Sequence, residues 1–141
     1  DPAIIVAVEN RGRLLLGRQA TWAARRYSVL AGFVEPGETL EQTVAREVFE
    51  ETRVRVLHSS YLGAQPWPFP GGLMLGFSAV AQDDEPVVDD ELEDARWFSH
   101  AEIGAALQRE VDDDGVGILP PPRISIARSL IEHWYHRHAT D

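Results

Sequence analysis

The chain has 141 residues, a formal net charge of −10 at pH 7 and no cysteine, and all 13 basic residues are arginines. The lack of cysteine excludes a disulfide framework, a cysteine-ligated zinc site and a thiol nucleophile. The lack of lysine excludes Schiff-base chemistry on a lysine and a Walker-type phosphate loop. A long nucleic-acid groove usually carries a stripe of basic residues, and none is visible in this sequence. The many carboxylates, in contrast, suit a divalent metal ion.

The length indicates one domain over residues 1–141. No apolar run approaches the roughly 18 residues that span a membrane, and no signal peptide is visible. We therefore expect a cytoplasmic protein without membrane contacts. Because the chain begins at Asp1-Pro2 without a methionine, we expect it to be part of a longer protein.

Apolar runs bounded by turn residues predict the strands. They are expected, in chain order, at residues 3–8, 13–17, 55–63, 73–81 and 95–98. The first two flank Asn10-Arg11-Gly12, which predicts a hairpin. A short apolar segment at 28–31 leads into a loop at 32–37 that contains two glycines and a proline.

Helical periodicity and capping residues predict three helices, at residues 39–52, 101–107 and 125–136. In the first, Leu40, Val44 and Val48 recur every four residues and form one apolar stripe. Thr39 and Gln42 have the spacing of a capping box. Strands before, between and after the helices indicate an α/β fold in which a mixed sheet is packed by helices on both faces.

Three carboxylates lie on one side of the first predicted helix, namely Glu47, Glu50 and Glu51. They span an arc of about 100° because a helix turns by about 100° per residue. Such side chains repel one another, and a hard cation with oxygen ligands relieves that repulsion. The spacing alone favours a solvated acidic face, and the metal site stays open as the alternative.

A longer pattern surrounds these carboxylates. Gly32 is followed after five residues by Glu38, and after seven more by Arg46-Glu47-Val48. Glu50-Glu51 and Arg53-Val54 complete the pattern. It resembles the Nudix box, G-x5-E-x7-R-E-U-x-E-E-x-G-U with U aliphatic, at every defined position except Arg53, where the family has glycine.

The resemblance to the Nudix family implies a mixed sheet between helices and hydrolysis of a nucleoside diphosphate linked to another group. Arg46 resembles the arginine that orients the glutamates, with Glu38 as its ionic partner. Glu51 resembles the residue most needed to activate water. The implied cofactor is Mg²⁺ or Mn²⁺, without zinc in this chain. The implied metal ligands are Glu47, Glu50, Glu51 and the backbone carbonyl of Ala31.

Prolines alternate with larger residues in Gln65-Pro66-Trp67-Pro68-Phe69-Pro70, and each proline holds the preceding residue extended. From the residues alone, the segment is either a platform for stacking a base or a stiff surface connection. After a Nudix box it resembles the NADH pyrophosphatase signature S-Q-P-W-P-F-P-x-S, with Ala64 and Gly72 replacing the serines. The implied substrate-binding residues are Gln65, Pro66, Trp67, Pro68, Phe69, Pro70, Gly71 and Gly72.

Further matches to this subfamily cover nearly the whole chain. Glu91-Leu92 and residues 95–98 resemble its E-L-x-x-A-x-W-F stretch, which implies that Glu91 is a distal metal ligand. By composition alone Glu91 is one more acid in the solvated segment 83–94. Phe33 matches an aromatic residue beside the nicotinamide, although by itself it is explained by core packing. Ala127 matches a substrate-contacting position.

The subfamily resemblance implies that the chain splits NADH into nicotinamide mononucleotide and AMP. Removal of NAD caps from RNA and hydrolysis of ADP-ribose stay open as alternatives, as does a nucleotide-binding module without turnover. The family acts as a homodimer, and we expect a homodimer here. Its upstream domain and four-cysteine zinc ribbon are expected to be absent from this chain. Trp22, Arg25 and Arg26 receive no role from the sequence.

Overall fold

The structure is a computed structural model that describes residues 2–66 and 73–138. All the predicted helices and strands are present, and the short apolar segment contributes a further strand. No helix among the described residues is long and apolar enough to cross a bilayer. The elements are β1 (Pro2–Asn10), β2 (Arg13–Arg18), β3 (Leu30–Phe33), α1 (Leu40–Thr52), β4 (Val56–Pro66), β5 (Leu73–Ala81), β6 (Asp94–Ser99), α2 (His100–Arg109) and α3 (Ile126–Arg137).

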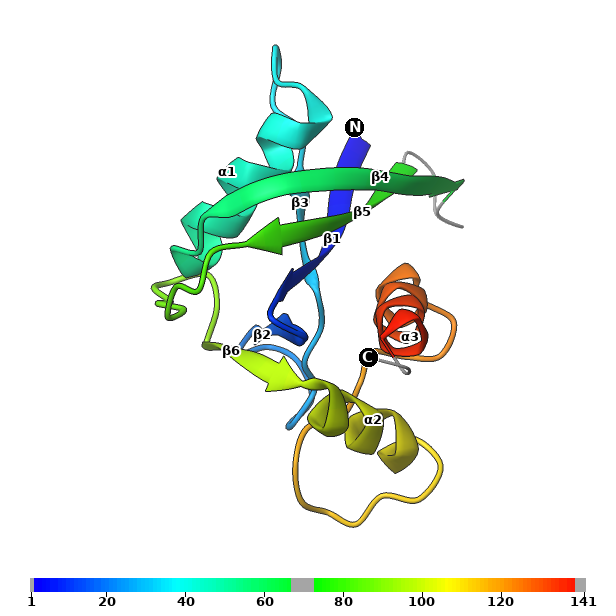
Figure 1. Cartoon of the computed structure of the whole chain (residues 1–141). Coiled ribbons are helices and arrows are strands. Elements are labelled where there is room, and N and C mark those ends of the chain that lie inside the picture. The colour runs from blue at the N-terminus through cyan, green and yellow to red at the C-terminus, as the bar shows by residue number, and fades with distance from the viewer. Residues whose placement is uncertain (1, 67–72, 139–141) are drawn as a thin grey trace.

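The strands form one mixed sheet with the order β4-β5-β1-β2-β6 (Figure 1). β1 is central because it pairs in parallel with β5 and antiparallel with β2 and β3. Its first half pairs with β3 and its last residues pair with β2. The predicted hairpin is present, and its turn holds Arg11 and Gly12 at positive φ, as two-residue hairpin turns of the common type require.

One face of the sheet is covered by α1 and the other by α2 and α3, which confirms the predicted sandwich (Figure 1). On the α1 face, Val6 and Val8 of β1 pack in one cluster with Val44 and Val48 of the helix. The predicted apolar stripe is therefore buried. β1 is buried on both faces, which is why its sequence is a continuous apolar run rather than an alternating one.

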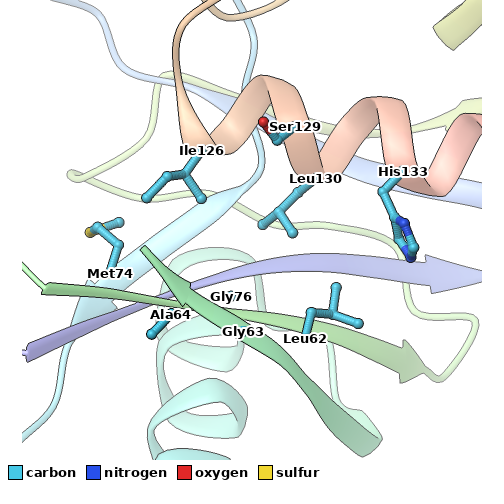
Figure 2. A pocket seen from close by; sticks show the side chains of 9 residues that line it. All are labelled: Leu62, Gly63, Ala64, Met74, Gly76, Ile126, Ser129, Leu130 and His133. Carbon is cyan, nitrogen blue, oxygen red and sulfur yellow. The ribbon is translucent and has the colours of Figure 1, made fainter. Parts of the chain in front are cut away.

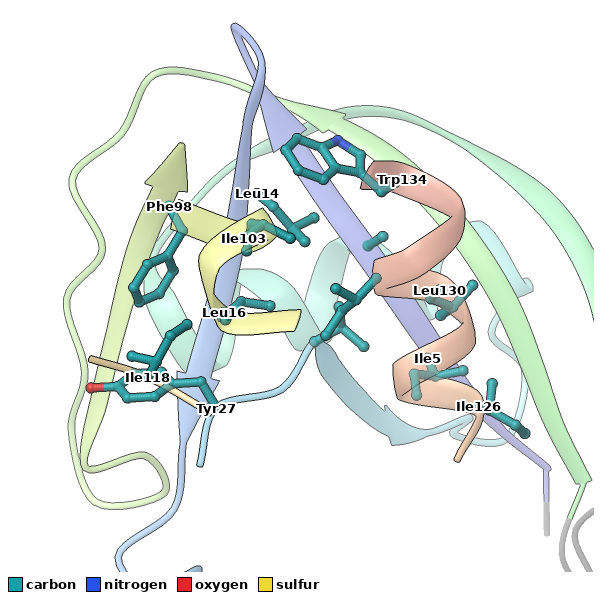
Figure 3. Close-up of a cluster of buried hydrophobic side chains, with 14 residues drawn as sticks. Ile5, Leu14, Leu16, Tyr27, Phe98, Ile103, Ile118, Ile126, Leu130 and Trp134 are labelled. Carbon is teal, nitrogen blue, oxygen red and sulfur yellow. The ribbon is translucent and has the colours of Figure 1, made fainter. Parts of the chain in front are cut away.

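The opposite cluster joins β1 and β2 to the two later helices (Figure 3). Leu14 and Leu16 of β2 contribute to it, together with Ile103 of α2 and Ile131 and Trp134 of α3. Fully burying an aliphatic or aromatic side chain stabilises the fold by about 1.5–3 kcal/mol. The two clusters thus hold the sheet between its helices and fix the position of α1 relative to β3.

The predicted capping box of α1 is confirmed, and α2 begins with one as well. The Thr39 hydroxyl accepts a hydrogen bond from the Gln42 backbone N–H at 3.1 Å, and the Gln42 side chain accepts one from the Thr39 N–H at 2.9 Å. Ser99 and Glu102 form the same reciprocal pair at the start of α2. These pairs satisfy backbone donors that the first helical turn leaves free.

The predicted end of β4 at Gly63 is wrong, because the strand continues to Pro66. The register shifts between Tyr61 and Gly63, and Gly63 has a φ of 148°. A bulge of this kind leaves one residue unpaired and lets the ladder resume. Gln65 then pairs with Met74, and Pro66 with Leu73. The start of the predicted substrate strip therefore belongs to the sheet.

Arg53, the one departure from the Nudix pattern, caps the C-terminus of α1 in the left-handed region with φ 61°. Its backbone N–H donates to the Phe49 carbonyl at 2.8 Å. The guanidinium lies 5.5 Å from the Phe49 ring centroid and 3.5 Å from a carboxylate oxygen of Asp89. The chain therefore adopts the conformation that favours glycine, and the arginine side chain supplies two partly compensating contacts.

We expect Arg53→Gly to be more stable than Arg53→Ala by about 1 kcal/mol, because only glycine enters the left-handed region without a steric cost. Both variants remove the same side-chain contacts, so the comparison isolates the backbone term. Urea unfolding followed by circular dichroism measures the difference. Equal stabilities of the two variants would show that the positive φ carries no cost here.

Candidate active site

The carboxylates at the site are held by Arg46, which lies in the middle of α1. Its Nε donates to Glu38 Oε2 at 2.6 Å, so the predicted ion pair is present. Its Nη1 donates to Oε1 of both Glu47 and Glu50 at 2.8 Å, and Nη2 donates to the Phe33 carbonyl at 3.0 Å. Glu35 Oε1 also lies 3.0 Å from Nε, so one planar guanidinium contacts four carboxylates and ties α1 to the end of β3.

Glu38 sits in the loop before α1 and is also fixed on its other side. The Arg46 guanidinium, together with the Glu35 backbone N–H, lowers the pKa of the Glu38 carboxyl to about 2. The Thr43 hydroxyl donates to the same carboxylate at 2.9 Å. Glu38 is therefore ionised at neutral pH and acts as a permanent counter-charge to Arg46.

Glu51 is different, because its carboxyl group, in the last turn of α1, is buried. The residue is only 8% exposed, and its Oε2 has no hydrogen-bond partner among the described residues. Burial, followed by the charges of Glu47 and Glu91, raises the pKa of Glu51 to about 8. A buried acceptor without a partner is costly and is typical of functional sites.

Gly32 allows the backbone of β3 to approach the carboxylates. A Cβ atom at this position would lie 2.1 Å from Cδ and 2.3 Å from Oε2 of Glu47. The Glu47 carboxylate therefore lies directly against the bare Cα of Gly32. Gly32 does not have positive φ, so the first glycine of the pattern is required here for close approach and not for backbone conformation.

A small cavity of about 140 Å³ brings Ala31 and Glu51 together. Leu30, Trp22 and Leu92 also line it. Burial raises the pKa of both Glu47 and Glu51, and the charge of the exposed Glu91 adds to this effect. The structure therefore brings Ala31 and Glu51 to one cavity and Glu47 against the neighbouring Gly32, while Glu50 shares the Arg46 guanidinium with Glu47.

The donor set fits a hard divalent cation, because it consists of carboxylates and a backbone carbonyl. Burial first, and then the charges of neighbouring carboxylates, raise the pKa of Glu47 and Glu51, and such a cation relieves the repulsion between those charges. Among the described residues no three acidic or histidine side chains already surround a common point. Instead Glu47 and Glu50 each give one oxygen to Arg46, which leaves their second oxygens for another partner.

The structure describes only some of the predicted substrate-binding residues. Phe33 is 67% exposed, so the core-packing alternative for it is wrong. Ala127 lies in the first turn of α3 and lines a groove beside Trp22. Gln65 and Pro66 are located by their backbone at the end of β4. Trp67, Pro68, Phe69, Pro70, Gly71 and Gly72 lie outside the described residues.

A separate cavity of about 400 Å³ lies between α3 and the β4–β5 hairpin (Figure 2). Leu62, Met74 and Leu130 give it an apolar lining, and Ser129 and His133 add polar atoms at α3. It lies on the face of the sheet opposite α1, and no predicted metal ligand lines it. It is therefore distinct from the carboxylate site.

Sequence reasoning missed Trp22, Ser28 and Leu92 as walls of the cavity beside Glu51. Ser28 lies next to β2, because it forms an isolated antiparallel β-bridge with Gly17 of that strand. No local pattern indicates that these residues meet, because they come from segments far apart in the sequence. The one available signal is the large aromatic Trp22 in an otherwise polar and small connection.

The chain matches the NUDIX domain family over residues 1–117. It therefore belongs to this family. Its fold is also similar to a solved Nudix hydrolase from Nitrosomonas europaea, with a TM-score of 0.67 at 26% identity, over 97% of this chain and 88% of that one. The resemblance in the sequence and the arrangement of the sheet and helices thus agree.

Two relatives are more similar to this chain in sequence than the Nitrosomonas europaea hydrolase is. The NAD-capped RNA hydrolase NudC of Mycobacterium bovis is 46% identical over 139 residues, which cover 95% of this chain and 44% of that protein. The human NAD-capped RNA hydrolase NUDT12 is 42% identical over 137 residues, covering 95% of this chain and 29% of that protein. The chain thus spans less than half the length of these relatives.

We expect Gly32→Ala to keep the fold but to weaken binding of Mn²⁺ by roughly 10- to 100-fold, the usual effect of disturbing groups around a metal ligand. The added methyl group displaces the Glu47 carboxylate, which is the end of a flexible side chain. Gly76→Ala is the matched control, because its Cβ would meet nothing closer than 3.4 Å. Calorimetric titration and melting curves would separate metal binding from stability, and unchanged Mn²⁺ affinity would contradict the role of Gly32.

We expect Glu51→Gln to stabilise the protein in chelator at pH 9, on the order of a few kcal/mol. The pKa of Glu51 is raised from 4.5 to about 8 by folding. Between these values the folded state holds a proton that the unfolded state releases, so the wild-type protein loses stability as the pH rises. Glutamine does not titrate, so the variant avoids this loss of stability, and its higher stability relative to the wild type should disappear near pH 5. Melting temperatures with the same pH dependence in both proteins would contradict the burial of a costly carboxylate.

Proposed function

We propose that the chain uses Mg²⁺ or Mn²⁺ to hydrolyse the diphosphate of NAD, carried either as free NADH or as the 5′ cap of an RNA. Free NADH would give nicotinamide mononucleotide and AMP. NAD-capped RNA would give nicotinamide mononucleotide and RNA with a 5′-monophosphate. The observation that carries the proposal is the buried Oε2 of Glu51, which has no partner among the described residues and lies in a cavity with Ala31. The family pattern around it departs from the Nudix box only at Arg53.

The metal ligands in this proposal are Glu47, Glu51, Glu91 and the Ala31 carbonyl, with Glu50 as a further carboxylate. A bound ion would lower the pKa of a water molecule and offset charge that develops on the diphosphate. Oε2 of Glu51 is placed to accept a proton, since no described group occupies it. Arg46 keeps Glu47 and Glu50 aligned, with Glu38 as its counter-charge.

The identity of the substrate rests on the Gln65–Gly72 strip and on relatives whose names specify NAD-capped RNA. Exposed Phe33 supports it, because a ring at the end of β3 is free to stack on a planar group. The names of the relatives favour the RNA cap as a substrate in addition to free NADH. We further propose that the protein is a homodimer, as the subfamily resemblance implies, and that it is cytoplasmic.

We expect the chain with Mg²⁺ to convert NADH to two mononucleotides, to release nicotinamide mononucleotide from NAD-capped RNA, and to act less well on ADP-ribose. Chromatography of the products separates the three reactions. EDTA should abolish each reaction, and Glu51→Gln should lower turnover by several orders of magnitude while the fold persists. Turnover that survives both treatments would contradict the metal-dependent proposal. ADP-ribose as the preferred substrate would contradict the assignment to NAD.

A further inference from the structure

A groove of about 520 Å³ lies between the β2–β3 connection and the segment before α3. We call it the Trp22 groove, and its walls include Trp22, Arg26, Pro121, Pro122, Arg123 and Ala127. Trp22 and Ser28 line both this groove and the cavity that holds Glu51. The groove and the cavity are therefore neighbours that share these two residues.

Trp22 is held in place by its own backbone. Its N–H donates to the Gln19 carbonyl at 3.1 Å, and its carbonyl accepts from Arg18 Nη2 at 3.3 Å. Arg18 also donates to the Ala23 carbonyl at 2.8 Å. The indole is half-buried, so a planar base could stack on it with little loss of conformational freedom.

The far wall of the groove is fixed by two arginines that share one carboxylate. Arg26 donates to the Pro120 carbonyl and lies 3.2 Å from Glu110. The buried Arg128 donates to the Pro121 carbonyl at 3.2 Å and lies 3.9 Å from Glu110. Because these contacts tie the proline-rich segment down, the groove is formed before any ligand arrives.

Arg123 lines this groove and has no carboxylate partner within residues 2–66 and 73–138. Every other arginine of the chain pairs with a carboxylate in the structure, whereas Arg123 is exposed and has no ion pair among the described residues. In a chain with a net charge of −10 this is unusual. A free cation beside an aromatic wall matches the alternation of phosphate and base in a single-stranded nucleic acid.

We infer that the Trp22 groove binds the RNA chain that follows an NAD cap, with Trp22 stacking on a base and Arg123 contacting a backbone phosphate. The inference rests on the proposed function, because the cap itself must lie at the carboxylates. It deepens that proposal by naming the residues that would distinguish capped RNA from free NADH. It also reconciles an acidic protein with an RNA substrate, since few phosphate contacts are needed.

Binding tests the inference without depending on turnover. The protein carries Glu51→Gln and Mg²⁺, and the probes are NADH and a fluorescein-labelled, NAD-capped, single-stranded oligoribonucleotide. We expect the capped RNA to bind more tightly than NADH. Arg123→Gln should weaken RNA binding several-fold and reduce the dependence of log K on log salt by about 0.7, the share of one phosphate contact on a single strand. Trp22→Ala should weaken RNA binding by roughly 5- to 150-fold.

The controls separate a specific contact from general charge or loss of fold. Arg123→Lys should retain most of the affinity and the salt slope. Arg11→Gln, in the exposed β1–β2 turn, removes the same charge elsewhere and should change neither. Equal losses for NADH and capped RNA would overturn the inference, because the groove would then hold the dinucleotide itself. An unchanged salt slope in Arg123→Gln, or RNA binding no tighter than that of NADH, would also overturn it. The proposed function is tested separately, by chromatography of the products that the wild-type protein forms from NADH and from NAD-capped RNA.

Discussion

The guanidinium of Arg46 is the contact on which the site depends, because it stands among carboxylates that would otherwise repel one another. It pairs with Glu38, Glu47 and Glu50 and also donates to the carbonyl of Phe33. A planar group with five donors can satisfy these acceptors in several directions, which a lysine ammonium on a flexible stem would do less well. The charge balance of α1 and its attachment to β3 therefore come from one side chain.

Packing on the other side of α1 makes the buried Glu51 possible. Val44 and Val48 are completely buried against the sheet, and Thr52 donates its hydroxyl hydrogen to the Val48 carbonyl inside the same region. This anchorage holds the last turn of α1 against the end of β3 and Leu92. A helix end fixed in this way can carry an unpartnered carboxylate oxygen that an exposed helix would turn toward water.

The acidic connection between β5 and β6 is more ordered than its composition indicates. Asp84 accepts from both the backbone and the side chain of Arg55, and Asp83 accepts from Arg13 at 2.8 Å. Exposed ion pairs of this kind contribute only about 0–1 kcal/mol each. Their effect is mainly on position, because they fix the path that brings Glu91 within electrostatic reach of the α1 carboxylates.

Local signals in the sequence were sufficient for the helices, their caps and the spacing of the carboxylates, because torsional preference and periodicity act over a few residues. They were not sufficient for the parallel pairing of β1 with β5, the continuation of β4 past Gly63, or the depth at which Glu51 lies. A helical pattern predicts which side of a helix a residue faces, but burial and pKa depend on what covers that side. At Glu51 the cover comes from Ala31, Trp22 and Leu92, which only the folded chain brings together.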